Sequence, residues 1–318
     1  MPWVVGIDEA GYGPNLGPLS QACVGLYLPA DDPGGWATVA RAVRRVGDPV
    51  DDRLLVDDSK AVYTGKNGFE ELERTVIALS GGETVSSLCV DRGVGEPTVG
   101  KEFWFHPDEP IPLQATRETC IHAREFWRNQ CSGEVGQSLM ISTALTATKR
   151  FNELVDQSGS KATVIMDRLA TFFRTAVERA VHPTTGSTED PIHFTCDKLG
   201  GRNFYGPMLM DTFPDGWPVA VVEGALESRY RILNLGRDIT VSFRPRADGE
   251  NICVAMASMV AKYARELCMK QFNEYWAALV PGISPTAGYP VDAKRFLSEI
   301  RTALKKKGHE IDEVWRKK

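Results

Sequence analysis

The chain has 318 residues, of which 42% are hydrophobic and 25% are charged, a composition typical of a globular enzyme with a core that needs no disulfide staples. The formal net charge of −5 argues against a surface that is basic throughout, although a local basic face remains compatible with it. The sequence contains neither a long apolar run nor a basic start followed by an apolar signal segment, so we expect no membrane association and a cytoplasmic location.

The seven cysteines are scattered along the chain. No two of them have the CxxC spacing, and none forms a cluster with histidines at zinc-ligand spacing. We therefore expect free thiols in a reducing compartment.

In the first half of the chain, strands and a helix are predicted around irregular segments. Short apolar, β-branched runs predict strands at residues 3–8 and 20–28, and a helix is expected at 67–80. Residues 29–52 have the composition of a surface excursion. Residues 90–117 are rich in glycine, proline and aromatic residues without a period, which indicates an insertion.

The second half alternates predicted strands and helices. The clearest helix is 162–181, whose apolar residues recur at helical spacing. The other expected elements are strands at 137–142, 193–196, 218–223 and 239–243 and helices at 143–156, 251–278 and 291–306. Strands interleaved with helices indicate an α/β fold.

The strongest chemical signal is a pair of adjacent acids, Asp8 and Glu9, after the first apolar strand. Neighbouring strand residues point to opposite faces, so both acids reach one site only if the strand ends there, and the glycines of the following turn permit this. Two such acids are costly to bury unless they bind a positive group. An exposed acidic strand end is the plain alternative for an Asp-Glu pair.

Residues 6–14, Gly-Ile-Asp-Glu-Ala-Gly-Tyr-Gly-Pro, resemble the first motif of the ribonuclease HII and HIII family, and Gly-Pro-Leu follows at 17–19. In that family the strand ends in Asp-Glu before a Gly-x-Gly turn. The resemblance implies that Gly11, Tyr12 and Gly13 contact the substrate.

Three further segments resemble the family in the same order. Residues 58–60, Asp-Ser-Lys, match a motif in which Ser59 and Lys60 contact substrate phosphate at a helix start. By itself Asp-Ser-Lys is also a common helix cap. Residues 246–266 match an Ala-Asp segment followed by a helix containing Lys262, whose small residues would let it lie close to the sheet. Residues 288–290, Gly-Tyr-Pro, resemble the element that places Tyr289 at the substrate's sugar.

The third acid has two candidates. Asp167 lies on the polar face of the helical pattern at 162–181, which is typical of a solvated position. Asp197 closes the 193–196 strand and precedes a glycine turn, as Asp8 does. We favour Asp197 as the third acid and Asp248 as the fourth.

The resemblance implies a ribonuclease H-like mixed sheet flanked by helices, with a C-terminal helical extension. We expect a catalytic domain over 1–280, with insertions near 29–52, 90–135 and 199–240. Residues 281–318 would then form a helical segment that binds substrate.

Four carboxylates, from Asp8, Glu9, Asp197 and Asp248, are hard oxygen ligands that suit Mg²⁺ or Mn²⁺ and not zinc. Two such ions can activate a water and stabilise the leaving oxygen of a phosphodiester. The resemblance implies hydrolysis of the RNA strand of RNA–DNA hybrids. We expect a monomer without an obligate protein partner. The alternatives are a related nuclease acting on branched or single-stranded DNA, and a non-catalytic nucleic-acid-binding relative.

The sequence departs from the family at two positions. Tyr12 stands where ribonuclease HII usually has arginine, and Lys294 stands where the Gly-Tyr element is usually followed by histidine. A backbone contact to the 2′-hydroxyl survives the first change, whereas a guanidinium–phosphate contact does not. The positive charge that binds substrate phosphate could instead come from basic residues elsewhere, among them Arg202.

Overall fold

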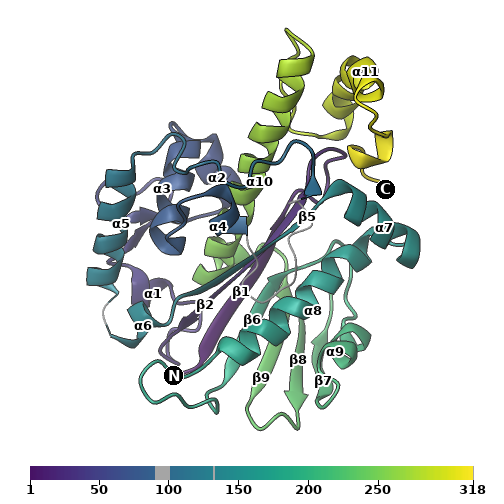
Figure 1. The fold of residues 1–318 in the computed structure, drawn as a ribbon. Helices are drawn as coiled ribbons and strands as arrows, with labels where there is room; N and C mark the ends of the chain where they lie inside the picture. Colours follow the sequence, from purple (N-terminus) through teal and green to yellow (C-terminus); the bar gives the residue numbers. More distant parts are fainter. Residues whose placement is uncertain (90–100, 132, 318) are drawn as a thin grey trace.

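A seven-stranded mixed sheet forms the centre of the computed structural model, which describes residues 1–89, 101–131 and 133–317. Its strand order is β5-β2-β1-β6-β9-β8-β7 (Figure 1). β1 pairs in parallel with β6, and β6 with β9, whereas the other neighbouring strands are antiparallel. The seven strands are β1 (Trp3–Ala10), β2 (Leu19–Tyr27), β5 (Met140–Thr146), β6 (Ile192–Asp197), β7 (Trp217–Glu223), β8 (Ser228–Leu233) and β9 (Ile239–Arg244).

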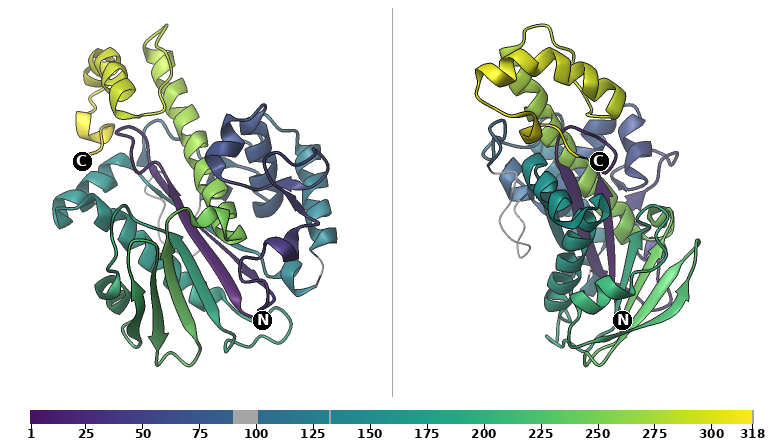
Figure 2. Two further views of the ribbon diagram at one scale, coloured as in Figure 1. Left: turned by 180° about the vertical axis from the view of Figure 1, so that it is seen from behind. Right: turned by 90° about the vertical axis from the view of Figure 1, so that its right-hand side faces the viewer.

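Helices cover both faces of this sheet, which confirms the expected mixed α/β fold. α8 (Lys161–Arg179) packs on one face and α10 (Ile252–Leu279) on the other (Figure 2). The remaining helices are α1 (Trp36–Val39), α2 (Ser59–Thr64), α3 (Gly68–Ser80), α4 (Val85–Cys89), α5 (Arg117–Gln130), α6 (Glu134–Gln137), α7 (Thr148–Ser158), α9 (Gly206–Thr212) and α11 (Pro290–Lys306). Two short 3₁₀ turns are η2 (Ala247–Gly249) and η3 (Ile311–Glu313), and β3 (Val43–Arg44) pairs with β4 (Leu54–Leu55).

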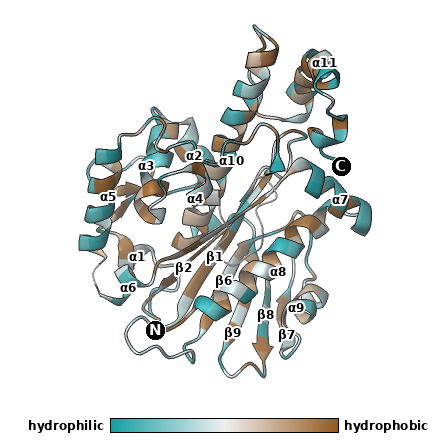
Figure 3. Ribbon diagram, viewed as in Figure 1, coloured by the Kyte–Doolittle hydropathy of each residue, from teal (hydrophilic) through white to brown (hydrophobic). Residues whose placement is uncertain are grey.

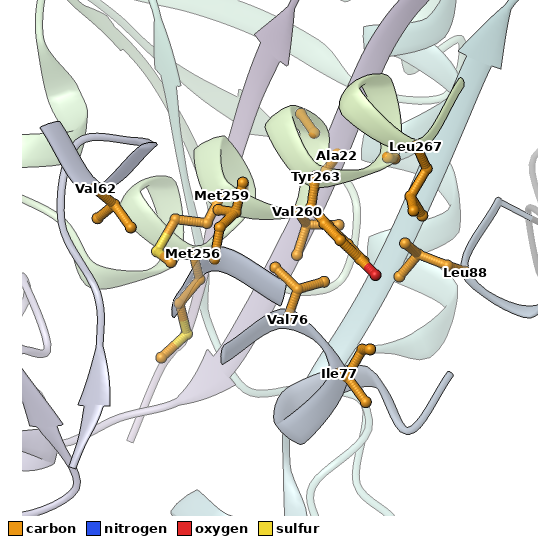
Figure 4. Packing of buried hydrophobic residues seen from close by; sticks show 14 of the residues in the cluster. Ala22, Val62, Val76, Ile77, Leu88, Met256, Met259, Val260, Tyr263 and Leu267 are labelled. Atoms are coloured by element: carbon orange, nitrogen blue, oxygen red, sulfur yellow. The ribbon is translucent and has the colours of Figure 1, made fainter. Parts of the chain in front are cut away.

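The larger core lies between α10, α3 and the sheet. Val260 and Tyr263 of α10 pack near Val76 and Ile77 of α3 (Figure 4). The hydropathy of the elements agrees with their place in the fold: the central strands β1 and β2 are largely apolar, whereas α7 is mostly hydrophilic (Figure 3). Each of the nine residues of β2 is buried, as expected for a strand covered on both faces.

The start of α10 lies directly against β1. A Cβ on Gly6 would stand 2.1 Å from the backbone nitrogen of Val254, so only glycine allows this approach. Asn251 begins the helix by accepting hydrogen bonds from the backbone N–H groups of Cys253 and Val254. This contact brings the first turns of α10 beside the end of β1 that carries the two acids.

Two parts of the sequence prediction are wrong. The segment expected to be helical at 143–156 begins as strand, since β5 continues to Thr146 and pairs there with Leu19 of β2. Pairing of its β-branched residues with β2 outweighs the weak helical pattern. The prediction also missed β8 and the helices α5 and α9, whose periods are short or interrupted.

The segments interpreted as insertions occupy different places. Residues 29–52 include buried Val39 and Val43, so this excursion joins the core. Of the segment 90–135, residues 90–100 and 132 lie outside the described residues, and α5 packs on α3. Within 199–240, β7 and β8 extend the main sheet beyond β9.

The last described residues return to the sheet. After α11 and η3, Trp315 pairs with Leu16 in an isolated bridge, next to the turn that follows β1. The end of the chain accordingly lies beside α7 and the upper end of β1 (Figure 1). Among the described residues, no helix has the length and apolar character needed to cross a bilayer.

Candidate active site

Asp8 and Glu9 lie within β1, not beyond it. The strand continues to Ala10, and Asp8 and Glu9 pair with Ala22 and Gln21 of β2. The expectation that the strand ends at the acids is therefore wrong. What ends there is the parallel pairing with β6, whose last pair is Ile7 with Cys196.

Because side chains alternate along a strand, the two acids leave β1 on opposite faces. Asp8 shares the α10 face with Gly6, where the nearby Ser258 hydroxyl of α10 partly opposes the rise in the pKa of its carboxyl. Glu9 follows the side of Ile7, which packs in the core under α8. Both acids nevertheless line one cavity of about 330 Å³, since β6 no longer separates the two faces at this level.

Asp197, and not Asp167, lines this cavity. Asp197 is the last residue of β6, and its carboxylate accepts a 3.5 Å hydrogen bond from the backbone N–H of Ala247. Asp167 is exposed on α8, as its polar pattern indicated. Of the two candidates, the structure brings only Asp197 to the cavity that the other three acids line.

Asp248 reaches the cavity from η2, the short turn that precedes α10. The residue before this turn, Arg246, has φ 57°, a left-handed conformation rarely adopted by a side-chain-bearing residue. This kink lets the chain pass from β9 into η2 and presents both Arg246 and Asp248 to the cavity.

The electrostatics of the four acids favour a positively charged ligand. Burial raises the pKa of Asp8 well above its usual value, with Glu9 and Asp197 adding repulsion. Burial, and then Asp197, raises the pKa of Glu9 to about 7, against the opposing charge of Lys60. The pKa values of Asp197 and Asp248 are also raised, mainly by burial.

The Gly11–Gly13 turn forms one wall of the cavity. Gly11 has φ +91°, and a Cβ there would lie 2.8 Å from the Arg265 side chain, so glycine is required. Gly13 has room for a Cβ, whose nearest neighbour would be Tyr289 at 3.8 Å. Tyr12 is half-buried, and the Lys161 ammonium lies 4.6 Å from the centre of its ring.

The Asp58–Lys60 segment also lines the cavity, and it forms the start of α2. Asp58 caps α2 by accepting hydrogen bonds from the backbone N–H groups of Lys60 (2.7 Å) and Ala61 (3.2 Å). Ser59 is buried, and its hydroxyl lies 2.8 Å from that of Ser258. The exposed Lys60 side chain lines the cavity.

The other basic candidates differ in position. Lys262 lines the cavity, forms a 2.5 Å ion pair with Glu266, and lies 4.1 Å from the centre of the Tyr63 ring. Tyr289 also lines the cavity and is exposed. Arg202 does not line it, although its charge reaches the Tyr12 hydroxyl.

Sequence reasoning did not assign four further residues around the cavity. Arg246, Ser258 and Arg265 line it, and Arg316 holds the glycine turn from behind. The first three lie inside the segment 246–266, so their place in that motif was a usable signal. Arg316 carried no such signal, because it belongs to no motif and is followed only by two further basic residues.

Divalent-metal chemistry fits this site by donor type. The four acids offer only carboxylate oxygens, the donors that Mg²⁺ and Mn²⁺ prefer. Burial and mutual repulsion make their ionised forms unfavourable, and a bound cation would offset this free-energy cost. Among the described residues, however, no three His, Cys, Asp or Glu side chains are placed closely enough together to ligate one ion. Ligation would therefore require side-chain rotation within the cavity.

No known family profile and no curated protein matches the sequence. Several solved structures are similar to this chain. Ribonuclease H2 from Pyrococcus horikoshii OT3 is 13% identical, with a TM-score of 0.48 over 98% of this chain and 92% of its own. A point mutant of Bst-RNase HIII is 15% identical, with a TM-score of 0.49 over 99% of this chain and 66% of its own. The PCNA:RNase HII complex from Archaeoglobus fulgidus gives 12% identity and a TM-score of 0.41 over 98% and 92%.

These structures are ribonucleases HII and HIII, the family that the sequence motifs resemble, and a further match is Bst-RNase HIII in complex with Mn²⁺. The chain spans about two thirds of the length of Bst-RNase HIII.

Proposed function

We propose that this protein is a divalent-metal-dependent endonuclease that hydrolyses the RNA strand of RNA–DNA hybrids. The observation that carries the proposal is the meeting of Asp8, Glu9, Asp197 and Asp248 in one cavity, although they come from three separate parts of the chain. Carboxylates that are partly withdrawn from water and repel one another destabilise a fold, and a bound cation would offset that cost.

The four carboxylates would hold two Mg²⁺ or Mn²⁺ ions. When bound, such ions activate water and stabilise the leaving oxygen of a phosphodiester. The chain's own residues supply the rest. The Ser258 hydroxyl stands near Asp8, and the backbone N–H of Ala247 orients Asp197.

Substrate binding would use the rim of the cavity. Lys60 and Arg246 have no ion pair with a carboxylate among the described residues, so both are available for phosphate. The Gly11–Gly13 backbone and the exposed Tyr289 ring line the same cavity, where a ribose 2′-hydroxyl could be read.

The test is a cleavage assay with matched labelled substrates: a hybrid, a duplex containing one ribonucleotide, and an all-DNA duplex, each with Mg²⁺, with Mn²⁺ and with chelator. We expect metal-dependent cleavage of the hybrid on its RNA strand and none of the DNA duplex. Cleavage that proceeds equally on the DNA duplex would replace the proposed substrate with DNA. If none of the three substrates is cleaved with either metal, the proposed nuclease activity is refuted.

A further inference from the structure

Arg316 is bonded to the glycine turn although 305 positions separate it from Gly11. Its side chain is completely buried. The guanidinium Nη2 donates to the carbonyl of Gly11 at 2.6 Å and also to the carbonyl of Pro14. Its backbone N–H donates to the carbonyl of Asn15 at 2.7 Å. One residue therefore fixes three positions of the turn.

The segment that carries Arg316 is anchored independently by α7. The Asn152 side-chain amide donates to the carbonyls of Asp312 and Trp315, both at 2.9 Å. The Asn152 side-chain oxygen accepts a 2.8 Å hydrogen bond from the backbone N–H of Lys317. The Arg316 guanidinium also lies 4.9 Å from the centre of the Phe151 ring of the same helix. Arg316 is thus held in place by α7 and by the turn together.

Arg265 holds the turn from the α10 side. Its guanidinium donates to the carbonyls of Pro18 (2.6 Å) and Leu16 (3.3 Å). Among the described residues, neither Arg265 nor Arg316 forms an ion pair with a carboxylate. Two buried guanidinium groups bonded only to carbonyls are costly to maintain. Together they bond to four carbonyls of the segment 11–18, whose first four residues line the candidate site.

We propose that Arg316 is a positioning residue of the candidate site, an inference that rests on the proposed function. It fixes the Gly11–Pro14 backbone in the conformation that faces the nucleic acid. Residues 315–317 are then part of the substrate-binding apparatus although none of them lines the cavity. The four acids belong to β1, β6 and η2, so loosening the turn weakens substrate binding and leaves metal binding intact.

The proposal is tested with Arg316→Lys and Asn152→Ala. Lysine keeps the charge but loses the planar fork that reaches two carbonyls. Asn152→Ala frees the 315–317 segment while both Arg316 and the residues of the turn stay unsubstituted. The matched control is Arg44→Met. Arg44 is also buried, but its guanidinium forms a 3.0 Å ion pair with Glu71, and neither residue lines the cavity. Arg44→Met reports the effect of losing a buried arginine as such.

Two readouts separate positioning from a general loss of stability. The first is hydrogen exchange at the amides of Asn15 and Leu16, which both donate to the carbonyl of Gly288. We expect exchange at least about tenfold faster in both test variants and unchanged in the control. The second is steady-state cleavage of the hybrid, where we expect KM to rise about tenfold with kcat within about threefold. The Mn²⁺ midpoint, measured by thermal shift, stays at the wild-type value.

Unchanged exchange in both test variants would overturn the proposal. So would a fall in kcat and Mn²⁺ affinity with KM unchanged, or the same KM effect in Arg44→Met. If wild-type protein cleaves no nucleic acid, the proposed function fails, and the exchange measurement still decides whether Arg316 holds the turn.

Discussion

Asp8 and Asp197 each follow, by one residue, the last parallel pair between β1 and β6, which is Ile7 with Cys196. Beyond that pair the two strands are no longer bonded to each other, and both acids line the cavity at this level. The charge of Asp197 adds to the raised pKa of Asp8. The spacing between these two carboxylates is therefore set by strand register, which is strongly specified in a sheet with buried faces.

Asp8→Asn should abolish metal-dependent hydrolysis while the fold is retained. We expect kcat to fall by roughly 10³-fold or more, since a ligand acting on the reacting centre is lost. Removing a buried charge from a repulsive cluster should also raise the Tm of the metal-free protein. The checks are a gel cleavage assay and a thermal melt in chelator. Metal-dependent turnover by pure Asp8→Asn protein would remove Asp8 from the mechanism.

The assignment of the third acid is tested by a matched pair of substitutions. Asp197→Asn should abolish cleavage, whereas Asp167→Asn should change it by no more than about threefold, as is usual for an exposed helix position. Both variants are assayed on the hybrid with Mg²⁺ at equal protein concentration. The opposite result, with only Asp167→Asn inactive, would overturn the third-acid assignment.

Lys60 and Arg246 should contribute to affinity through charge. Each change to alanine should weaken hybrid binding and lower the slope of log Kd against log salt concentration by about 1. Binding is followed by fluorescence anisotropy in the Asp8→Asn background. Lys66→Ala, an exposed lysine that does not line the cavity, is the control. If neither Lys60→Ala nor Arg246→Ala changes the salt slope measured for Asp8→Asn alone, a phosphate contact is excluded for both residues.

Tyr12 should limit cleavage at a single embedded ribonucleotide, because its side chain offers no guanidinium to a phosphate. We expect the hybrid to be cleaved better than a duplex with one ribonucleotide. Tyr12→Arg should narrow the ratio of the two kcat/KM values by about tenfold, the value of one charge-assisted contact. Tyr12→Phe, which keeps the ring near Lys161, should leave the ratio unchanged. If the wild type prefers the single-ribonucleotide duplex, Tyr12 is not the determinant.

Glu102 gives a pH-dependent contribution to stability away from the catalytic acids. Burial, with repulsion from Glu313, raises the pKa of Glu102 from 4.5 to about 7. Because the folded state holds this proton more tightly than the unfolded state, Glu102 favours folding below about pH 4.5, and that contribution is lost as the pH rises to about 7. Glu102→Gln should therefore raise the Tm at about pH 8 and have little effect at about pH 4.5. The exposed Glu125→Gln is the control, and an equal shift at both pH values would contradict the raised pKa.

The sequence by itself determined the order of most strands and helices, and it predicted that Asp8, Asp248 and Asp197, but not Asp167, belong to one site, residues that the structure places in one cavity. These are local signals: an apolar run that ends in an acid, a glycine turn, or a polar helix face, each readable within about ten residues. The close approach of α10 to the sheet was likewise indicated by the small residues in its first turns.

Only the tertiary structure decided how two adjacent acids on opposite faces of β1 share one cavity, because that depends on where β6 ceases to pair with β1. It also decided the strand at 143–146, whose partner β2 lies far earlier in the chain, and the place of Arg316 behind the glycine turn. Each of these is a contact between segments distant in sequence, and a single chain's local pattern carries no signal of which distant backbone carbonyl or strand edge it will meet.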